Sequence, residues 1–247
     1  MNIVAQLTLD ALTEIGEINV RNYLDYLAVA CESSPPPFGF SWYGKKYQTL
    51  ACEPTWFANS LITNARKEGE GSQKLWELSG QIDDPIISDK IRLHAIDESR
   101  HAYMYIKLLD LVFVDVLEQS FRSEILESLP NYTSSDYPSR LPSVSETYIL
   151  DSLIQMNIGE IRTRINQQLM VPIILVYCPE QRRKKLKALV DSLLLDETRH
   201  IMYTAQLIEQ AISYGYGNLV DTIMQKRLAE FNNITIDEVG EGRFEGT

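Results

Sequence analysis

The chain has 247 residues, of which 45% are hydrophobic and 23% charged, so it can bury a sizeable core as an ordinary globular protein. Its net charge of −11 argues against a broad nucleic-acid-binding surface, which would be basic. Its three cysteines lie far apart and indicate neither a disulfide framework nor a thiolate metal site.

Helical periodicity and helix-breaking residues predict a chain of helices joined by loops. Helices are expected at residues 4–30, 54–79, 86–120, 145–168, 180–213 and 217–231. Pro54 and Pro179 fit the first turns of their helices, whereas Pro172 should kink or end the fourth helix. Residues 33–40 form a breaker-rich loop that leads into aromatic residues, and residues 129–143 form another connection. No segment shows sustained strand alternation, so the predicted fold class is all-α.

One pentapeptide occurs twice, as Asp97-Glu98-Ser99-Arg100-His101 and as Asp196-Glu197-Thr198-Arg199-His200. Each copy contains Glu-x-x-His, and residues three apart share one face of a helix, so the carboxylate and the imidazole can reach one metal ion. The chain has one further histidine, His94, which lies one turn before Glu98. A single such motif is more often a solvated glutamate beside a core histidine. The duplication favours metal binding instead.

Both motifs lie in the middle of apolar helical stripes. The first stripe contains Ile87, Ile91, His94, Glu98, His101, Tyr105, Leu108 and Val112, and the second contains Leu186, Val190, Leu193, Glu197, His200, Thr204 and Leu207. Ionised carboxylates are rarely buried without a partner, because desolvation costs several kcal/mol. A divalent or trivalent metal ion would supply the missing positive charge.

A four-helix carboxylate site also needs one glutamate from each of two further helices. On the fourth helix, Glu160 lies in the apolar stripe Ile149, Leu153, Met156, Glu160, Thr163 and Gln167. On the second helix the choice lies between Glu68 and Glu70. Glu68 shares a face with Phe57, Leu61 and Ala65, whereas the face through Glu70 carries mostly polar residues. We therefore choose Glu68.

The aspartate and the arginine of each pentapeptide admit two readings. Asp97 and Asp196 could each accept the second ring N–H of a ligating histidine, which fixes its tautomer and raises its basicity. Alternatively, Arg100 and Arg199 form ion pairs on the helix surface. Neither reading changes the metal ligands expected from the stripes.

The order Glu68, Glu98-x-x-His101, Glu160, Glu197-x-x-His200 resembles the ligand set of the ferritin-like di-iron carboxylate superfamily, over residues 55–210. The resemblance implies a single ferritin-like domain over residues 1–247, with a four-helix bundle core at about 55–213. Residues 1–54 would then form an N-terminal helix and an aromatic loop, and residues 214–247 a C-terminal helix and a polar tail. It also implies two bound iron ions, with manganese as the alternative.

The nearest branch is the aminobenzoate N-oxygenase type, which adds a seventh ligand, a histidine one turn before a Glu-x-x-His motif. His94 stands in that relation to Glu98. In that branch, however, the additional histidine belongs to the second motif helix, where this chain has Leu193. By this resemblance His94 would be a seventh metal ligand, on the other motif helix. The alternative is a neutral core imidazole that donates a hydrogen bond to a backbone or carboxylate oxygen.

The resemblance implies an enzyme, a di-iron oxygenase that activates dioxygen and acts on a small organic substrate, with N-oxygenation of an amine as the reaction of the nearest branch. An external electron donor is required, because the chain has no flavin, nicotinamide or iron–sulfur motif. The alternatives are another di-iron oxidase or hydroxylase, and ferritin- or rubrerythrin-like handling of iron or peroxide. A metal-stabilised partner module is a further alternative, and a homodimer stays open.

The amino terminus lacks a basic segment followed by an apolar core, and no apolar run reaches membrane-spanning length. We therefore expect a cytoplasmic protein with neither a membrane nor a nucleic acid as its partner.

Overall fold

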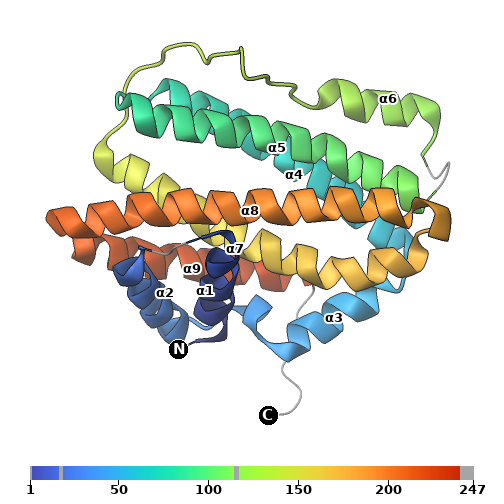
Figure 1. Ribbon diagram of the computed structural model, residues 1–247, viewed down its shortest axis with the longest axis horizontal. Coiled ribbons are helices and arrows are strands. Elements are labelled where there is room, and N and C mark those ends of the chain that lie inside the picture. Colours follow the sequence, from blue (N-terminus) through green and yellow to red (C-terminus); the bar gives the residue numbers. More distant parts are fainter. Residues whose placement is uncertain (1, 17–18, 114–116, 240–247) are drawn as a thin grey trace. The chain divides into compact units, whose positions relative to one another are not determined.

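The computed structural model describes residues 2–16, 19–113 and 117–239, and every regular element in these ranges is helical (Figure 1). The α-helices are α1 Ile3–Ile15, α2 Arg21–Ser33, α3 Ser41–Ala51, α4 Pro54–Gly80, α5 Pro85–Val112, α6 Gln119–Ser128, α7 Glu146–Tyr177, α8 Arg183–Ala211 and α9 Gly217–Val239. Short helical turns occur at η1 Pro37–Gly39, η2 Glu180–Arg182 and η3 Ile212–Tyr216. The all-α prediction is confirmed.

The chain divides into two compact units. Unit 1 combines Met1–Leu50, Glu146–Met170 and Leu194–Thr247, and unit 2 combines Ala51–Ser145 and Val171–Leu193. Helices α7 and α8 contribute residues to both units. The single domain expected over residues 1–247 and its ferritin-like topology stay predictions.

In unit 2, helices α4 and α5 lie side by side (Figure 1). Helix α4 begins at Pro54, where the missing N–H would have had no helical partner. Helix α5 begins after Asp84, whose carboxylate accepts two backbone N–H groups of the first turn at 2.8 and 3.0 Å. Near the middle of the pair, Ser72 Oγ donates to the carbonyl oxygen of Ala95 at 2.6 Å. This buried hydrogen bond fixes the register of the two helices.

The segment that follows α6 packs against helix α4. A Cβ at Gly80 would overlap the carbonyl oxygen of Ser139, so only glycine permits this close backbone approach. The backbone N–H of Leu141 donates to the carbonyl oxygen of Gly80 at 3.0 Å. Trp76 and Tyr132 stack with their ring centroids 4.1 Å apart. The predicted connection at residues 129–143 is therefore an ordered cover for α4.

In unit 1, helix α2 packs against α1 and α9. The hydroxyl of Tyr23, on α2, donates to Asn157 Oδ1 of α7 at 2.7 Å, and Asn157 Nδ2 donates to Thr204 Oγ1 of α8 at 2.9 Å. Burial raises the pKa of Tyr23 well above its usual value, so the phenol keeps its proton and can act as this donor. The network joins three helices one turn from Glu160 and one turn from His200.

The prediction of one continuous helix over residues 4–30 is wrong, because the helix is interrupted near its middle. Helix α1 ends at Ile15, and α2 begins only at Arg21. Gly16 has a φ of 150°, a backbone conformation that residues with a side chain rarely adopt. The hydrophobic periodicity continued across this glycine, which is why the break was not predicted.

The predicted aromatic loop is shorter than expected, because residues 41–51 form helix α3. Tyr43 is buried on this helix, and its hydroxyl donates to Asn166 Oδ1 of α7 at 2.7 Å. The aromatic residues that the sequence placed in a loop thus anchor a helix within unit 1.

Three other helix ends differ from the prediction. Helix α5 ends at Val112 instead of residue 120, and the separate helix α6 was not predicted. Helix α7 continues through Pro172, which lies between the buried residues Met170 and Ile174. Packing of such residues can outweigh the backbone hydrogen bond that a proline removes. Helix α9 extends to Val239. Residues 232–239, predicted as the start of the polar tail, are therefore helical, and residues 240–247 of that tail lie outside the described residues.

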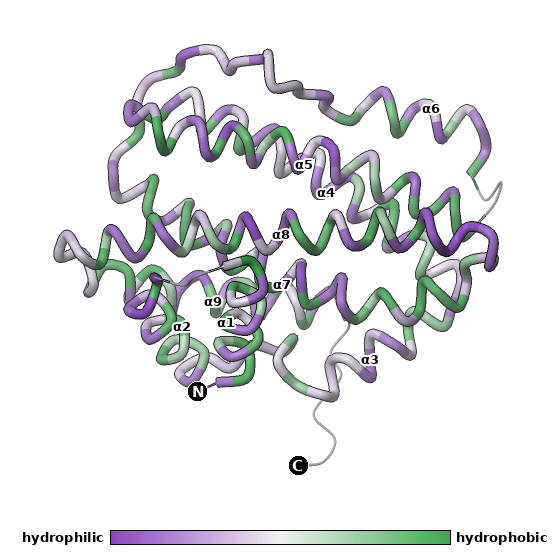
Figure 2. The backbone as a smooth tube through the Cα atoms, viewed as in Figure 1, coloured by the Kyte–Doolittle hydropathy of each residue, from purple (hydrophilic) through white to green (hydrophobic). Residues whose placement is uncertain are grey.

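Apolar residues form stripes along the helices. Figure 2 shows hydrophobic and hydrophilic residues alternating along α5 and α8, as expected for helices with one buried face. Among the described residues, no helix combines the length and the apolar character needed to cross a membrane.

Candidate metal centre

The first pentapeptide lies in the middle of α5, on its buried face. His94, Glu98 and His101 are 2%, 6% and 0% exposed. One carboxylate oxygen, Glu98 Oε1, lies 3.3 Å from His94 Nε2 and 3.4 Å from His101 Nδ1. The spacing i, i+4, i+7 thus brings three side chains of one helix to the same point.

Helix α4 adds Glu68 to this point. Glu68, Glu98 and His101 each offer a ligand atom, and the three atoms lie within 4.8 Å of one another. Two donors bound at about 2.0–2.2 Å to one ion can be up to about 4.4 Å apart, so small adjustments suffice to hold a metal. Glu68 is half-buried, whereas Glu70 is exposed. These three residues and His94 are called the unit 2 set below.

The charge on Glu98 follows from its contacts. Burial acts to raise its pKa, but hydrogen bonds with Glu68, His101 and His94 outweigh burial and hold the pKa of this carboxyl well below its usual range. These contacts favour the ionised form of Glu98, which is the form that binds a cation.

The second pentapeptide forms a similar set in unit 1, from Glu160 of α7 and Glu197 and His200 of α8. Glu197 is fully buried, and His200 Nδ1 lies 3.4 Å from Glu197 Oε2 and 3.9 Å from Glu160 Oε2. A neighbour that the sequence analysis did not single out is Gln167, whose Nε2 donates to Glu197 Oε1 at 2.6 Å. Glu160, Glu197, His200 and Gln167 are called the unit 1 set.

The aspartates of the two pentapeptides contact the arginines three residues later. Arg100 Nη2 donates to Asp97 Oδ1 at 2.8 Å, and Arg199 Nη1 donates to Asp196 Oδ1 at 3.2 Å. Asp196 is buried, whereas Asp97 is partly exposed. The arginines thus form the predicted ion pairs, and the role of the aspartates as acceptors for ligating histidines stays a prediction.

Arg164 fixes the second pentapeptide from the neighbouring helix α7. Its Nε donates to Thr198 Oγ1 at 2.9 Å, and the Thr198 hydroxyl in turn donates to the carbonyl oxygen of Leu194 at 2.7 Å. Burial lowers the pKa of Arg164, but a guanidinium keeps its proton at neutral pH. Arg164 therefore links α7 to α8 at Thr198, which lies between Glu197 and His200 in the sequence.

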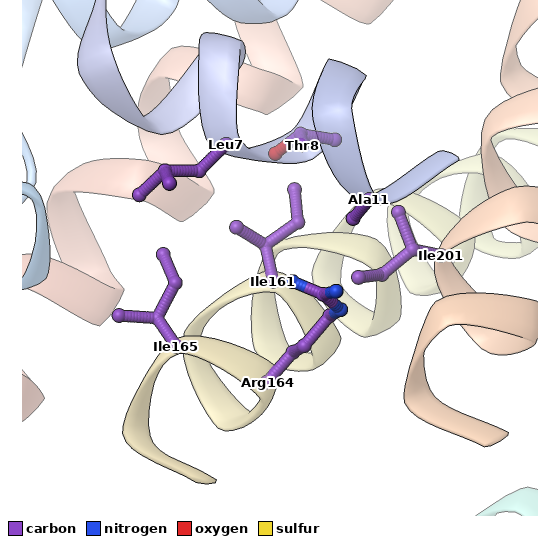
Figure 3. A pocket seen from close by; sticks show the side chains of 7 residues that line it. All are labelled: Leu7, Thr8, Ala11, Ile161, Arg164, Ile165 and Ile201. Atoms are coloured by element: carbon purple, nitrogen blue, oxygen red, sulfur yellow. The ribbon is translucent and has the colours of Figure 1, made fainter. Parts of the chain in front are cut away.

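Beside Arg164 is a small pocket with room for about one water molecule (Figure 3). Its lining residues are Leu7, Thr8, Ala11, Ile161, Arg164, Ile165 and Ile201. Figure 3 shows Arg164 and Ile161 extending from α7 toward the residues of α1. Successive helical residues point about 100° apart, so Ile161 and its neighbour Glu160 face different directions. None of the metal ligands that we predict lines this pocket.

The carboxylate and imidazole donors of both sets are groups that can hold a metal ion. A cation held by the carboxylates of one set would neutralise their charge and offset the cost of burying it. Comparisons of the chain with models of known protein families, with curated proteins and with solved structures found no match. The two sets themselves are thus the basis for any functional assignment.

A pair of single substitutions tests which glutamate of α4 is a ligand. Glu68→Ala is expected to remove one iron per chain, because it deletes a carboxylate from the unit 2 set. Glu70→Ala removes an exposed carboxylate of the same helix and is the matched control, with iron content unchanged. Elemental analysis of both iron-loaded variants measures the difference. Loss of iron only in Glu70→Ala would show that the wrong face of α4 was chosen.

Proposed function

We propose that the chain is a non-haem di-iron enzyme that activates dioxygen and transfers oxygen to a small organic substrate. The observation that carries the proposal is the convergence of Glu68, Glu98 and His101 within 4.8 Å at a buried point. The unit 1 set repeats this composition of two carboxylates and one imidazole. That both sets serve one dinuclear centre rests on their order along the chain, which resembles that of the ferritin-like di-iron proteins.

Charge balance supports two metal ions. The two sets contain four glutamates, and four ionised carboxylates match the charge of two divalent ions. Without cations, the ionised carboxylates within each set would repel one another. With cations, the same groups are neutralised and satisfied as ligands.

When bound, the iron ions would supply the reaction with dioxygen. The chain's own residues hold the ions and keep bulk water away, since the two motif glutamates lie on buried helix faces beside apolar residues such as Ile91 and Leu193. One oxygen atom would go to the substrate and the other would leave as water. The two electrons come from an external reductant, and the two protons come from solvent.

His94 is proposed as an additional ligand in the unit 2 set. His94→Ala is expected to leave two irons per chain but to change the Mössbauer parameters of only one, because one nitrogen donor is lost. Leu193→Ala is the matched control, since Leu193 holds the same position before the second motif and is equally buried. Identical spectra of His94→Ala and the wild type would reduce His94 to a packing residue.

Anaerobic reduction of the iron-loaded protein, followed by exposure to dioxygen, tests the proposed function. Stoichiometric dioxygen consumption with an optical change is expected, and a library of small aromatic and aliphatic amines then identifies the oxygenated product. Iron that is oxidised and accumulates well beyond two ions per chain would favour iron storage instead. Reduced protein that does not react with dioxygen would contradict oxygen activation.

A further inference from the structure

We infer that Gln167 is a positioning residue that holds Glu197 to a single ligating oxygen, so that the two metal positions differ in coordination. The inference rests on the proposed metal-binding function. Gln167 lies on α7, two turns after Glu160, and is 2% exposed. Its Nε2 donates to Glu197 Oε1 at 2.6 Å, a short hydrogen bond between two buried side chains.

The two oxygens of Glu197 have different neighbours. Oε2 lies 3.4 Å from His200 Nδ1, and the same imidazole nitrogen lies 3.9 Å from Glu160 Oε2. An ion held by Glu160, Glu197 and His200 would therefore meet Oε2. Oε1 instead accepts the Gln167 amide, which fixes the rotation of the carboxylate plane. While this hydrogen bond is in place, the lone pair of Oε1 that it uses is not available to an ion, which favours ligation through Oε2.

Glu98, the motif glutamate of the unit 2 set, has different neighbours from Glu197. Glu98 Oε1 faces two imidazole nitrogens, those of His94 and His101, at 3.3 and 3.4 Å. An imidazole nitrogen can ligate a metal ion, whereas an amide N–H can only donate a hydrogen bond. The same Glu-x-x-His motif thus has a further ligand candidate in one set and an orienting donor in the other. This difference makes the two metal positions inequivalent.

A purely structural role for Gln167 would be to satisfy a buried carboxylate. Loss of that contact would lower the stability of the fold but would leave the coordination of the metal as it was. Partners that orient a ligand also change metal affinity, by about 10–100-fold when they are removed. The two roles therefore separate on metal spectra and affinity.

Cobalt(II) is a suitable probe, because its visible absorption weakens as its coordination number rises. Gln167→Met keeps the length of the side chain and removes the donor. We expect weaker absorption from one of two bound cobalt ions, as Glu197 turns to chelate with both oxygens. We also expect the affinity of that site to change by at least about tenfold.

Asn166→Leu is the matched control. It removes another side-chain amide of α7, the one that accepts the Tyr43 hydroxyl at 2.7 Å. This variant should lose stability but retain the wild-type cobalt spectrum. Gln167→Leu, which also has no hydrogen-bond donor, should again alter the spectrum and provides a second test if Gln167→Met does not fold.

Wild-type cobalt spectra and affinities in a folded Gln167 variant would overturn the positioning role while leaving the proposed function intact. A wild-type protein that binds neither cobalt nor iron would instead overturn the proposed function itself. The two failures are therefore distinguishable in one series of titrations.

Discussion

Replacement of both motif glutamates, Glu98→Gln with Glu197→Gln, is expected to abolish iron binding and dioxygen consumption. Glutamine has the same shape as glutamate, so the helices should still pack, but each set loses a negative charge and an oxygen donor. Removing an outer partner of a metal ligand already weakens binding by about 10–100-fold, so removing a central ligand from both sets should exceed that loss. Iron content per chain and oxygen uptake measure the effect.

The matched control for this double variant exchanges two exposed glutamates of other helices, Glu70→Gln with Glu127→Gln, and changes the net charge equally. Its iron content should equal that of the wild type. If the motif variant bound iron as tightly as this control, Glu98 and Glu197 would not be metal ligands. Circular dichroism of the two variants excludes unfolding as the cause of any loss.

Iron loading is expected to raise the melting temperature strongly. A metal that binds only the folded state stabilises it by about 4 kcal/mol per site when free metal is a thousandfold above Kd. One kcal/mol corresponds to roughly 2–4 °C in a protein of 150–250 residues, so one site should shift the melting temperature by roughly 8–16 °C. Thermal unfolding with iron and with a chelator, both under anaerobic conditions, gives this shift.

The double variant Glu98→Gln with Glu197→Gln provides the control for this stabilisation, because it should melt at the same temperature with and without iron. Equal melting temperatures of iron-loaded and chelator-treated wild-type protein would mean that the buried sets are structural. In that case the hydrogen bonds around Glu98 would account for its ionised carboxylate without any metal.

The helix content and the position of both motifs could be predicted from the sequence, because periodicity and proline signals are local. The exceptions are positions where the local signal did not decide the structure. Gly16 ends a helix within an unbroken hydrophobic pattern, and the buried neighbours of Pro172 keep a helix intact where the proline predicted a kink or an end. Propensity competes with tertiary packing at such positions, and the sequence alone does not show which prevails.

For the candidate site, a helical face was predictable but a specific contact was not. The stripe through Glu160 already contained Gln167, yet nothing in the spacing showed that its amide would meet Glu197 of another helix at 2.6 Å. The contact between Arg164 and Thr198 was hidden for the same reason. Such contacts depend on the rotation and the register of two helices, which a pattern on one helix does not determine.

The number of iron ions per chain tests the central claim most directly. The protein is loaded with ferrous iron without oxygen, freed of loosely bound metal, and assayed for iron and protein by independent methods. We expect close to two ions per chain in the wild type and none in Glu98→Gln with Glu197→Gln. A wild-type value of one or zero, or two ions that persist in the double variant, would contradict a dinuclear centre held by these two sets.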